Sequence, residues 1–132
     1  MCNLNTTTNL KQQTVFKVVY KTKDGYKSCF AKSKVVIGKV IPQTERPKDG
    51  IYYKAVPSLF NELAVGRSSG FEKLEIATIL AATYGSYSNI CILKIELGGS
   101  IVSGTALGIM NHKYDREIVY AGTEILSIEE VG

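Results

Sequence analysis

Two short segments of this sequence carry the residue types from which an anion site can be built. The first is Gly66–Gly70, with the sequence GRSSG, which lies directly before a predicted helix. Backbone N–H groups at a helix N-terminus favour an anion, and Arg67 could add a charge-assisted contact. Because glycine and serine also serve to turn and cap a chain between helices, a plain linker is the alternative. We take Arg67 and Ser68 as candidate ligand-binding residues.

The second segment is the polar cluster from Asn111 to Arg116. Tyr114 can stack on a base or a sugar, Arg116 can bind a phosphate through two hydrogen bonds, and Asn111 can recognise an amide-like edge. These are the groups that bind a nucleotide. A solvated loop between two β segments would have a similar composition, so both interpretations remain open.

Catalytic and metal chemistry find little support in the sequence. The chain has a single histidine, His112, and no CxxC, HxH or HExxH pattern that would hold a metal ion. A thiol nucleophile at Cys29 or Cys91 would need that histidine as its base, but Cys91 lies within an apolar run, as a small buried residue would. We therefore predict a non-enzymatic protein without a metal or a cofactor. An enzyme that uses His112 as a general base is a third alternative.

Charge is divided unevenly along the chain. Residues 1–56 carry eleven Lys or Arg against three Asp or Glu, a net charge of +8, whereas residues 57–132 carry five against nine, a net charge of −4. This division predicts either an anion-binding face or attraction between the subunits of a homo-oligomer. Ten of the eleven basic residues are lysine, and lysines also protect sheet edges from aggregation, so the composition argues against nucleic acid as a partner.

Length and composition are those of one folded domain. The chain has 132 residues, of which 45% are hydrophobic and 21% are charged. No apolar run approaches the roughly 20 residues of a membrane-spanning helix, and three scattered cysteines fit a reducing compartment. We expect a cytoplasmic protein that does not contact a membrane. Residues 1–13 are polar and predict a flexible N-terminal tail, and residues 14–132 predict a single α+β domain.

The elements of the basic half are predicted from alternation and turn residues. Phe16, Val18 and Tyr20 alternate with Lys17, Val19 and Lys21, which is typical of a half-buried strand. Asp24-Gly25 is suited to the centre of a type I′ turn, so Tyr26–Phe30 is the predicted returning strand. Further predictions are a strand over Val35–Ile41 interrupted at Gly38, a loop over Pro42–Gly50 that carries Arg46, and a short strand over Ile51–Ala55.

The acidic half begins with helices and ends with strands. A helix is predicted to begin at Ser58, and a second to span Phe71–Thr83 with Leu74, Ala77, Leu80 and Ala81 on one face. Asn89–Leu97 predicts a central strand that a helix covers on one side, and Gly98-Gly99 predicts a turn after it. The last predicted elements are two β segments, Glu117–Tyr120 and Thr123–Ile128, which are separated at Ala121-Gly122. Together these elements predict an α+β fold, an antiparallel or mixed sheet with one or two helices packed on one face.

The segments VFKVVYKTKDGYKSCFA and REIVYAGTEILSIEEV resemble the opening and closing strands of small phage and prophage proteins. Within this class, the chain is similar in size and in its lack of catalytic motifs to Thoeris anti-defence sponges. The resemblance implies sequestration of a cyclic ADP-ribose-type signal or a cyclic nucleotide in a site between subunits of an oligomer. By residue type, it implies Arg116, Tyr114 and Asn111 as candidates for that site.

Two functions from different classes follow from these observations. The first is a non-enzymatic binding protein for a small anionic, nucleotide-derived ligand, held by loops that contain Arg46, Arg67 and Arg116 within the attractive field of the lysine-rich strands. The second is a protein-interaction module or inhibitor that presents its lysine-rich hairpin to an acidic partner.

Overall fold

The structure is a computed structural model that describes residues 3–28, 34–40, 66–83, 89–106 and 116–132. Most of these residues form one eight-stranded sheet in which every strand pairing is antiparallel. The strands are β1 (Asn3–Thr7), β2 (Gln13–Thr22), β3 (Gly25–Ser28), β4 (Lys34–Val35), β5 (Gly38–Lys39), β6 (Ser68–Phe71), β7 (Ile90–Thr105) and β8 (Ile118–Glu130), and the described helix is α2 (Leu74–Thr83). The α+β prediction is confirmed at this level, with more strand than the sequence indicated.

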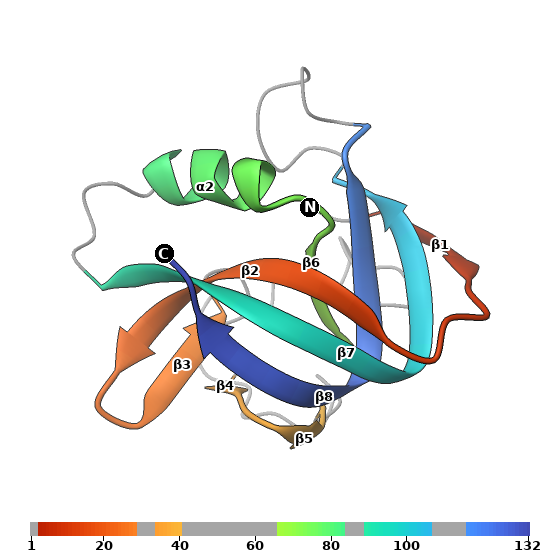
Figure 1. Cartoon of the computed structure of the whole chain (residues 1–132), viewed down its shortest axis with the longest axis horizontal. Coiled ribbons are helices and arrows are strands. Elements are labelled where there is room, and N and C mark those ends of the chain that lie inside the picture. The colour runs from red at the N-terminus through yellow and green to blue at the C-terminus, as the bar shows by residue number, and fades with distance from the viewer. Residues whose placement is uncertain (1–2, 29–33, 41–65, 84–88, 107–115) are drawn as a thin grey trace, which may run out of the picture.

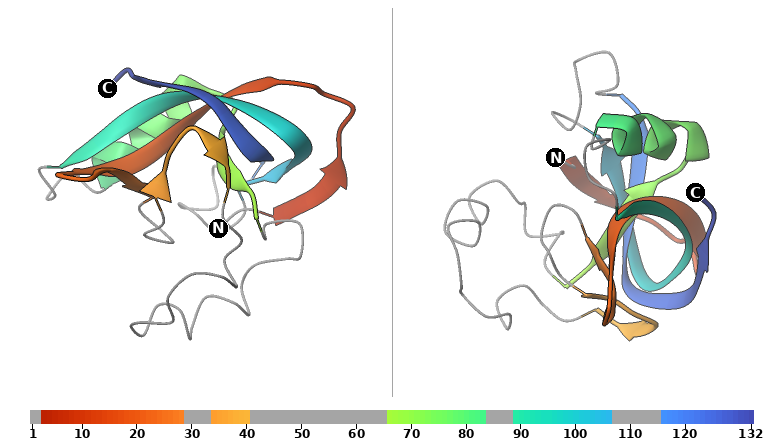
Figure 2. Two further views of the ribbon diagram at one scale, coloured as in Figure 1. Left: turned by 90° about the horizontal axis from the view of Figure 1, so that it is seen from below. Right: turned by 90° about the vertical axis from the view of Figure 1, so that its left-hand side faces the viewer.

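The sheet closes on itself through four of its strands. β2 pairs with β7 over residues 13–20 and with β6 at Phe16 and Phe71, while β8 pairs with both β6 and β7. The pairings β2–β7–β8–β6–β2 therefore form a ring, which the right-hand view of Figure 2 looks along. β1 extends the sheet beside β7, β3 and β4 extend it beside β2, and β5 pairs with β8 (Figure 1).

The ring separates two apolar clusters because successive residues of a strand point to opposite faces. One cluster lies between the sheet and α2, where Ile76 and Ala77 of the helix pack with Val18 of β2 and Ile92 of β7. The other lies on the opposite face and contains the fully buried side chains of β2 and β7, including Val15, Val19, Leu93, Ile95 and Leu97. The prediction of a central strand with a helix on one side is thus confirmed for β7.

β7 is longer than the sequence predicted. The expected turn at Gly98-Gly99 is wrong, because the strand continues to Thr105 with a shift of register between Gly98 and Ile101. Gly99 has a φ of +71°, which glycine adopts without the steric penalty of a side chain. The strand therefore bends at an irregularity, and its second half pairs with β1 and β8. The expected separation at Ala121-Gly122 is also wrong, since β8 is continuous there.

The prediction of a flexible tail is wrong for residues 3–7. These residues form β1, which pairs with Val102–Thr105 of β7, and Leu4 is 2% exposed in the cluster beneath α2. One buried leucine and a strand-to-strand ladder are enough to order a polar segment, because the backbone groups of the ladder carry the pairing. Composition alone did not indicate this.

The predicted hairpin is confirmed, with a different turn. Thr22 pairs with Gly25, so Lys23 and Asp24 are the two loop residues instead of Asp24 and Gly25. The Thr22 hydroxyl donates to the Gly25 carbonyl at 2.8 Å and accepts from the Asp24 N–H at 3.3 Å. These hydrogen bonds close the turn, and Gly25 follows it with a φ of +114°.

Three further predictions are corrected by the described residues. The strand expected over Val35–Ile41 is divided into β4 and β5, which pair with β3 and β8 respectively, and Gly38 has a φ of +122° between the two pairings. The segment expected as a helix linker forms β6 from Ser68, so the helix begins at Leu74 instead of Phe71. Leu74 is 42% exposed, and the helix packs through Ile76, Ala77, Leu80 and Ala81.

Several predictions lie outside the described residues. They are Phe30 and Ile41 at strand ends, the loop over Pro42–Gly50 with Arg46, the strand over Ile51–Ala55, the helix from Ser58, and the cluster residues Asn111, His112 and Tyr114.

Candidate functional site

The fold brings the basic half of the sequence against the acidic half within one chain. Lys21 of β2 forms an ion pair with Glu130 of β8, with 3.1 Å between Nζ and Oε2. Lys39 of β5 lies directly opposite Glu124 of β8 in the ladder. Within the acidic half, Lys94 of β7 also lies opposite a carboxylate, that of Glu129 in β8. Part of the charge division therefore becomes complementary cross-strand pairing in the folded molecule.

One pair of lysines departs from this pattern. Lys27 of β3 lies directly opposite Lys34 of β4, and Tyr20 of β2 lies opposite Lys27 on its other side. Directly opposed residues of neighbouring strands point to the same face of a sheet. Tyr20, Lys27 and Lys34 therefore form one row across three strands, and we name this row the cationic face. Tyr20 and Lys27 are half-buried and Lys34 is exposed.

No carboxylate borders this row among the described residues that share its face. The neighbouring positions on β2 are Val18 and Thr22, and the described ion pairs involve other lysines. Like charges directly opposite each other destabilise a sheet. The cationic face thus keeps a repulsive arrangement that the rest of the described sheet avoids.

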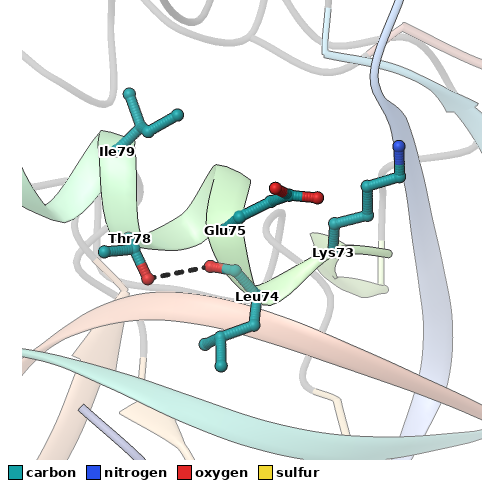
Figure 3. A pocket seen from close by; sticks show the side chains of 5 residues that line it. All are labelled: Lys73, Leu74, Glu75, Thr78 and Ile79. Carbon is teal, nitrogen blue, oxygen red and sulfur yellow. Dashed lines mark hydrogen bonds between the residues drawn. The ribbon is translucent and has the colours of Figure 1, made fainter.

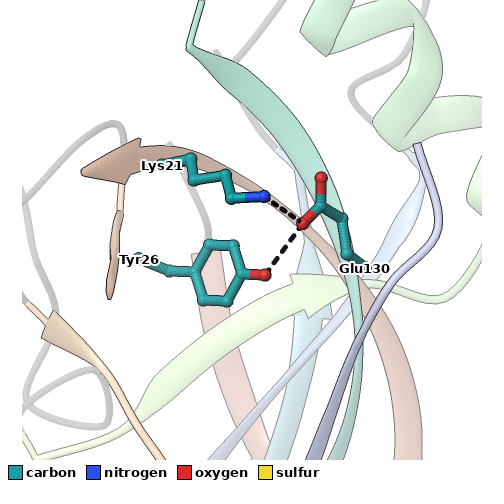
Figure 4. A network of polar contacts seen from close by, with 3 residues as sticks. All are labelled: Lys21, Tyr26 and Glu130. Carbon is teal, nitrogen blue, oxygen red and sulfur yellow. Dashed lines mark hydrogen bonds and ion pairs between the residues drawn. The ribbon is translucent and has the colours of Figure 1, made fainter. Parts of the chain in front are cut away.

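The other face of the same hairpin holds a three-residue network, which we name the carboxylate clasp (Figure 4). The Glu130 carboxylate accepts hydrogen bonds from the Tyr26 hydroxyl at 2.8 Å and from Lys21 Nζ at 3.1 Å. The hydrogen bonds from Tyr26 and then Lys21 lower the pKa of Glu130. Conversely, the hydrogen bond to Glu130 is the main reason why the pKa values of Lys21 and Tyr26 are both raised. The clasp joins the end of β8 to the hairpin.

The clasp predicts a stability profile with a loss at each extreme of pH. A lowered pKa means that the Glu130 contribution is present above the ordinary carboxyl pKa of about 4.3 and is lost as pH falls through the folded value. The raised pKa values of Tyr26 and Lys21 mean that their contributions are lost as pH rises above about 10. Glu130→Gln should lower the thermal midpoint by a few degrees at neutral pH, since exposed ion pairs contribute little.

Thermal unfolding from pH 3 to pH 11 measures this effect. The difference between wild type and Glu130→Gln should be largest near neutral pH and shrink toward both ends. Glu129→Gln is the matched control because Glu129 is the adjacent carboxylate of β8 and takes no part in the clasp. Parallel curves for wild type and Glu130→Gln over the whole range would contradict the assignment.

The Gly66–Gly70 segment does not form a loop at a helix N-terminus. Ser68 is buried in β6 and pairs with Gly122, and residues 69–73 separate it from the start of α2 at Leu74. The Arg67 guanidinium donates from Nε to the Ser100 carbonyl at 3.1 Å and from Nη2 to Ser100 Oγ at 2.6 Å. Arg67 is therefore hydrogen-bonded to Ser100, which lies within the irregularity of β7. The expected geometry, a loop directly before a helix N-terminus, is wrong because Ser68 begins a strand.

Arg116 lies at the other end of the same ladder. Ser68 pairs with Gly122 and Phe71 with Val119, so Arg67 and Arg116 lie beyond opposite ends of β6. If the register of β6 and β8 is continued by one residue, Arg67 lies beside residue 123. Arg116 is seven positions earlier in the chain, which corresponds to roughly 20 Å in an extended strand. Arg116 is exposed. The structure therefore does not bring these two arginines together within one chain, and Arg46 lies outside the described residues.

The outward side of α2 forms a shallow, open depression (Figure 3). Lys73, Leu74, Glu75, Thr78 and Ile79 line it. The Thr78 hydroxyl donates to the Leu74 carbonyl at 2.9 Å, and Lys73 Nζ lies 3.8 Å from Glu117 Oε2. Thr78 and Lys73 thus have partners, and the depression also presents the exposed Glu75 beside the exposed apolar surface of Leu74 and Ile79.

Nucleophile and metal chemistry also find no arrangement in the described part of the chain. Cys91 is a free, buried thiol in the apolar cluster on the sheet face away from α2. Burial raises the pKa of this thiol, which disfavours the reactive thiolate. The described residues contain no group of three His, Cys, Asp or Glu placed to hold a metal ion. Nor does any described helix have the length and apolar character required to cross a membrane.

Comparison of the chain with protein-family models, with curated proteins and with solved structures finds no match. Function is therefore inferred from the geometry of the chain itself, in which the cationic face departs from the charge pairing of the strands around it. Sequence reasoning placed Lys27 and Tyr20 on one hairpin but not side by side. The signal it lacked was the register, since the pairing of Lys27 with Lys34 requires a third strand.

Proposed function

We propose that this chain is a non-enzymatic binding protein for an anionic ligand and that the cationic face receives the ligand. The supporting observation is the pairing of Lys27 with Lys34, while Lys21, Lys39 and Lys94 each face a carboxylate. A like-charge pair costs stability in the free protein. A bound anion would remove that repulsion, so the arrangement is better suited to the bound state than to the free state.

A nucleotide-derived ligand is the first class to test, because the resemblance to anti-defence sponges implies a cyclic ADP-ribose or cyclic-nucleotide signal. Sequestration of such a signal in the cytoplasm would need no catalytic group. A loop site is the alternative to the cationic face for this ligand, and its candidate residues are Arg46, Arg67, Ser68, Asn111, Tyr114 and Arg116. A site that uses both Arg67 and Arg116 would have to be shared between subunits of a homo-oligomer, since they lie at opposite ends of β6 in one chain.

The second candidate function is a protein-interaction module that docks on an acidic partner. The position of the cationic face favours it, because β4 is the last strand in the sheet order and the row of lysines runs out to that margin. A surface at a sheet margin is accessible to a large partner, and its charges would accelerate association at low salt.

Replacing both lysines of the cationic face tests the proposal. Lys27→Gln with Lys34→Gln should abolish binding and leave the thermal midpoint unchanged or slightly raised, because the substitution removes a repulsion. Lys39→Gln with Lys94→Gln is the matched control, which removes the same charge from lysines that face carboxylates. The control should retain binding and gain no stability.

Native mass spectrometry and thermal shift provide the measurements. Wild-type protein should retain a co-purified anion, or gain thermal stability with cyclic ADP-ribose, a cyclic dinucleotide or inorganic polyphosphate. Arg116→Ala distinguishes a loop site from the cationic face, since it should weaken binding only if the loop participates. Equal binding by the Lys27/Lys34 variant and the control would overturn the assignment of the face. A stoichiometric acidic protein recovered in place of a small anion would favour the second candidate.

A further inference from the structure

We infer that β3 and β4 form a flap that opens and closes over the apolar cluster on the sheet face away from α2. The carboxylate clasp holds this flap closed, and the repulsion between Lys27 and Lys34 favours the open state. An anion bound at the cationic face would remove the repulsion and so favour closure. The flap itself follows from contacts within the chain, whereas its control by an anion rests on the proposed function.

The first argument is the weak attachment of the flap to β8. β3 pairs with β2 at four positions, and β4 pairs with β3 at two. β8 pairs with β5 at Glu124 and Ile125, whereas its residues 126–130 pair with neither β3 nor β4 in the described part of the chain. Side chains close this seam instead of a backbone ladder. Elements with short ladders and few buried contacts open locally before the whole molecule unfolds.

The second argument is a pair of glycines at the two ends of the flap. Gly25 begins β3 with a φ of +114°, and Gly38 follows β4 with a φ of +122°. A Cβ atom at either position would meet nothing within 4 Å, so the backbone there has open space around it. Hinges are the few positions that absorb large changes of φ and ψ, and glycine adopts either sign of φ. Both ends are therefore suited to act as hinges.

The third argument is that two opposing influences act on opposite faces of the flap. Tyr26 and Val35 belong to the apolar cluster, and the Tyr26 hydroxyl donates to Glu130 of β8 at 2.8 Å (Figure 4). Lys27 and Lys34 point to the other face, directly opposite each other. An exposed ion pair stabilises a protein only slightly, and like charges at opposed positions destabilise it by a similar amount. A change on either face therefore shifts the population of the open flap.

Cys91 serves as a reporter of the flap. Its thiol is 6% exposed and lies in the same cluster as Tyr26 and Val35. Burial is the main cause of the raised pKa of Cys91, and the charges of Glu130 and Lys21 also act on it, which places the clasp near the thiol. Opening the flap uncovers this end of the cluster, so the rate at which a reagent reaches Cys91 measures the open population.

Alkylation of the native protein by iodoacetamide, with Cys91 quantified by peptide mapping, tests the inference. Tyr26→Phe and Glu130→Gln should each accelerate the alkylation of Cys91 about threefold, because each weakens the clasp. Tyr26→Phe removes no charge, so a faster rate in this variant reports the lost hydrogen bond. Glu129→Gln is the matched control for Glu130→Gln, since it removes the adjacent carboxylate of β8 and should leave the rate unchanged.

The lysines should have the opposite effect. Lys27→Gln with Lys34→Gln should slow the alkylation of Cys91 about threefold, because it removes the repulsion that favours opening. Lys11→Gln with Lys94→Gln is the matched control, since it removes the same charge from positions outside the flap. Inorganic polyphosphate should slow alkylation of the wild type and have no effect on the Lys27/Lys34 variant. Thermal unfolding of each variant verifies that it is folded before rates are compared.

Alkylation in increasing urea separates the flap from global unfolding. A rate that hardly changes at low urea identifies local opening, because a small opening exposes little surface. The inference is refuted if the rate rises with the full slope of global unfolding, or if both clasp variants react as Glu129→Gln does. Polyphosphate that binds without slowing alkylation would overturn the control by an anion. Absence of anion binding would overturn the proposed function alone, since the variants test the flap without a ligand.

Discussion

Replacing Leu93 with Ala should lower the free energy of unfolding by about 3 kcal/mol, the middle of the range for buried leucines. Leu93 is fully buried near the start of β7, where it lies between Lys17 of β2 and Glu130 of β8. Both flanking strands are held by long ladders, and the surrounding side chains belong to a closed ring. The neighbours therefore have little freedom to move into the cavity that the substitution leaves.

Leu126→Ala is the matched control because it removes the same atoms from an exposed position. Leu126 lies at the irregularity of β8, is 41% exposed, and should cost less than about 1 kcal/mol. Chemical denaturation of the wild type and both variants measures the difference through the midpoint, with similar slopes expected for all three. Comparable losses of unfolding free energy for the two variants would show that the cluster around Leu93 is not the main apolar core.

Elements specified by local pattern could be predicted from the sequence. The alternation in β2, the turn near Gly25 and the apolar run of β7 each depend on residues close together in the chain, and all three are present in the structure. α2 was also predicted, although its start was placed three residues early because β6 precedes it.

Elements specified by distant partners could not be predicted. Leu4 is the buried residue among those of β1 whose burial is described, and the pairing partner of β1 lies about a hundred residues away in β7. β6 has the composition of a linker, and it becomes a strand because β8 pairs with all four of its residues and β2 pairs with it at Phe71. Gly98 and Gly99 indicate a turn locally, but pairing with β8 continues past them. In each case tertiary pairing outweighs local propensity.

The candidate site was predictable in composition and not in arrangement. The predicted hairpin contained both Tyr20 and Lys27, but its turn at Asp24-Gly25 would have paired Lys27 with Thr22 instead of Tyr20. The decisive pair of Lys27 and Lys34 depends on β4, and the strand predicted from local pattern began one residue after Lys34, at Val35. The charge division was visible, but the folded register shows which lysines it leaves without an opposing carboxylate.

Replacing Gly70 with Ala should destabilise the protein by about 2 to 3 kcal/mol, at the upper end of the usual cost of overpacking. A Cβ atom at Gly70 would lie 2.6 Å from Val15 Cγ2, 2.8 Å from Val15 Cβ and 3.0 Å from the Phe16 carbonyl oxygen. Val15 is fully buried and β-branched, so its side chain cannot turn away, and the Phe16 oxygen belongs to the backbone. β6 would have to move from β2 at the pairing of Phe16 with Phe71, which closes the ring.

Gly98→Ala provides the contrast for this prediction, because a Cβ atom there meets a different kind of neighbour. It would lie 3.0 Å from Cγ, Cδ1 and Cδ2 of Leu126, whose side chain is 41% exposed and can rotate toward solvent. The expected cost is below about 1 kcal/mol. Denaturation midpoints of the two variants should therefore differ clearly, although each adds one methyl group to a strand glycine. If Gly70→Ala were tolerated as well as Gly98→Ala, β6 would not be held against β2 as closely as the ring requires, and the closure of the sheet would have to be reconsidered.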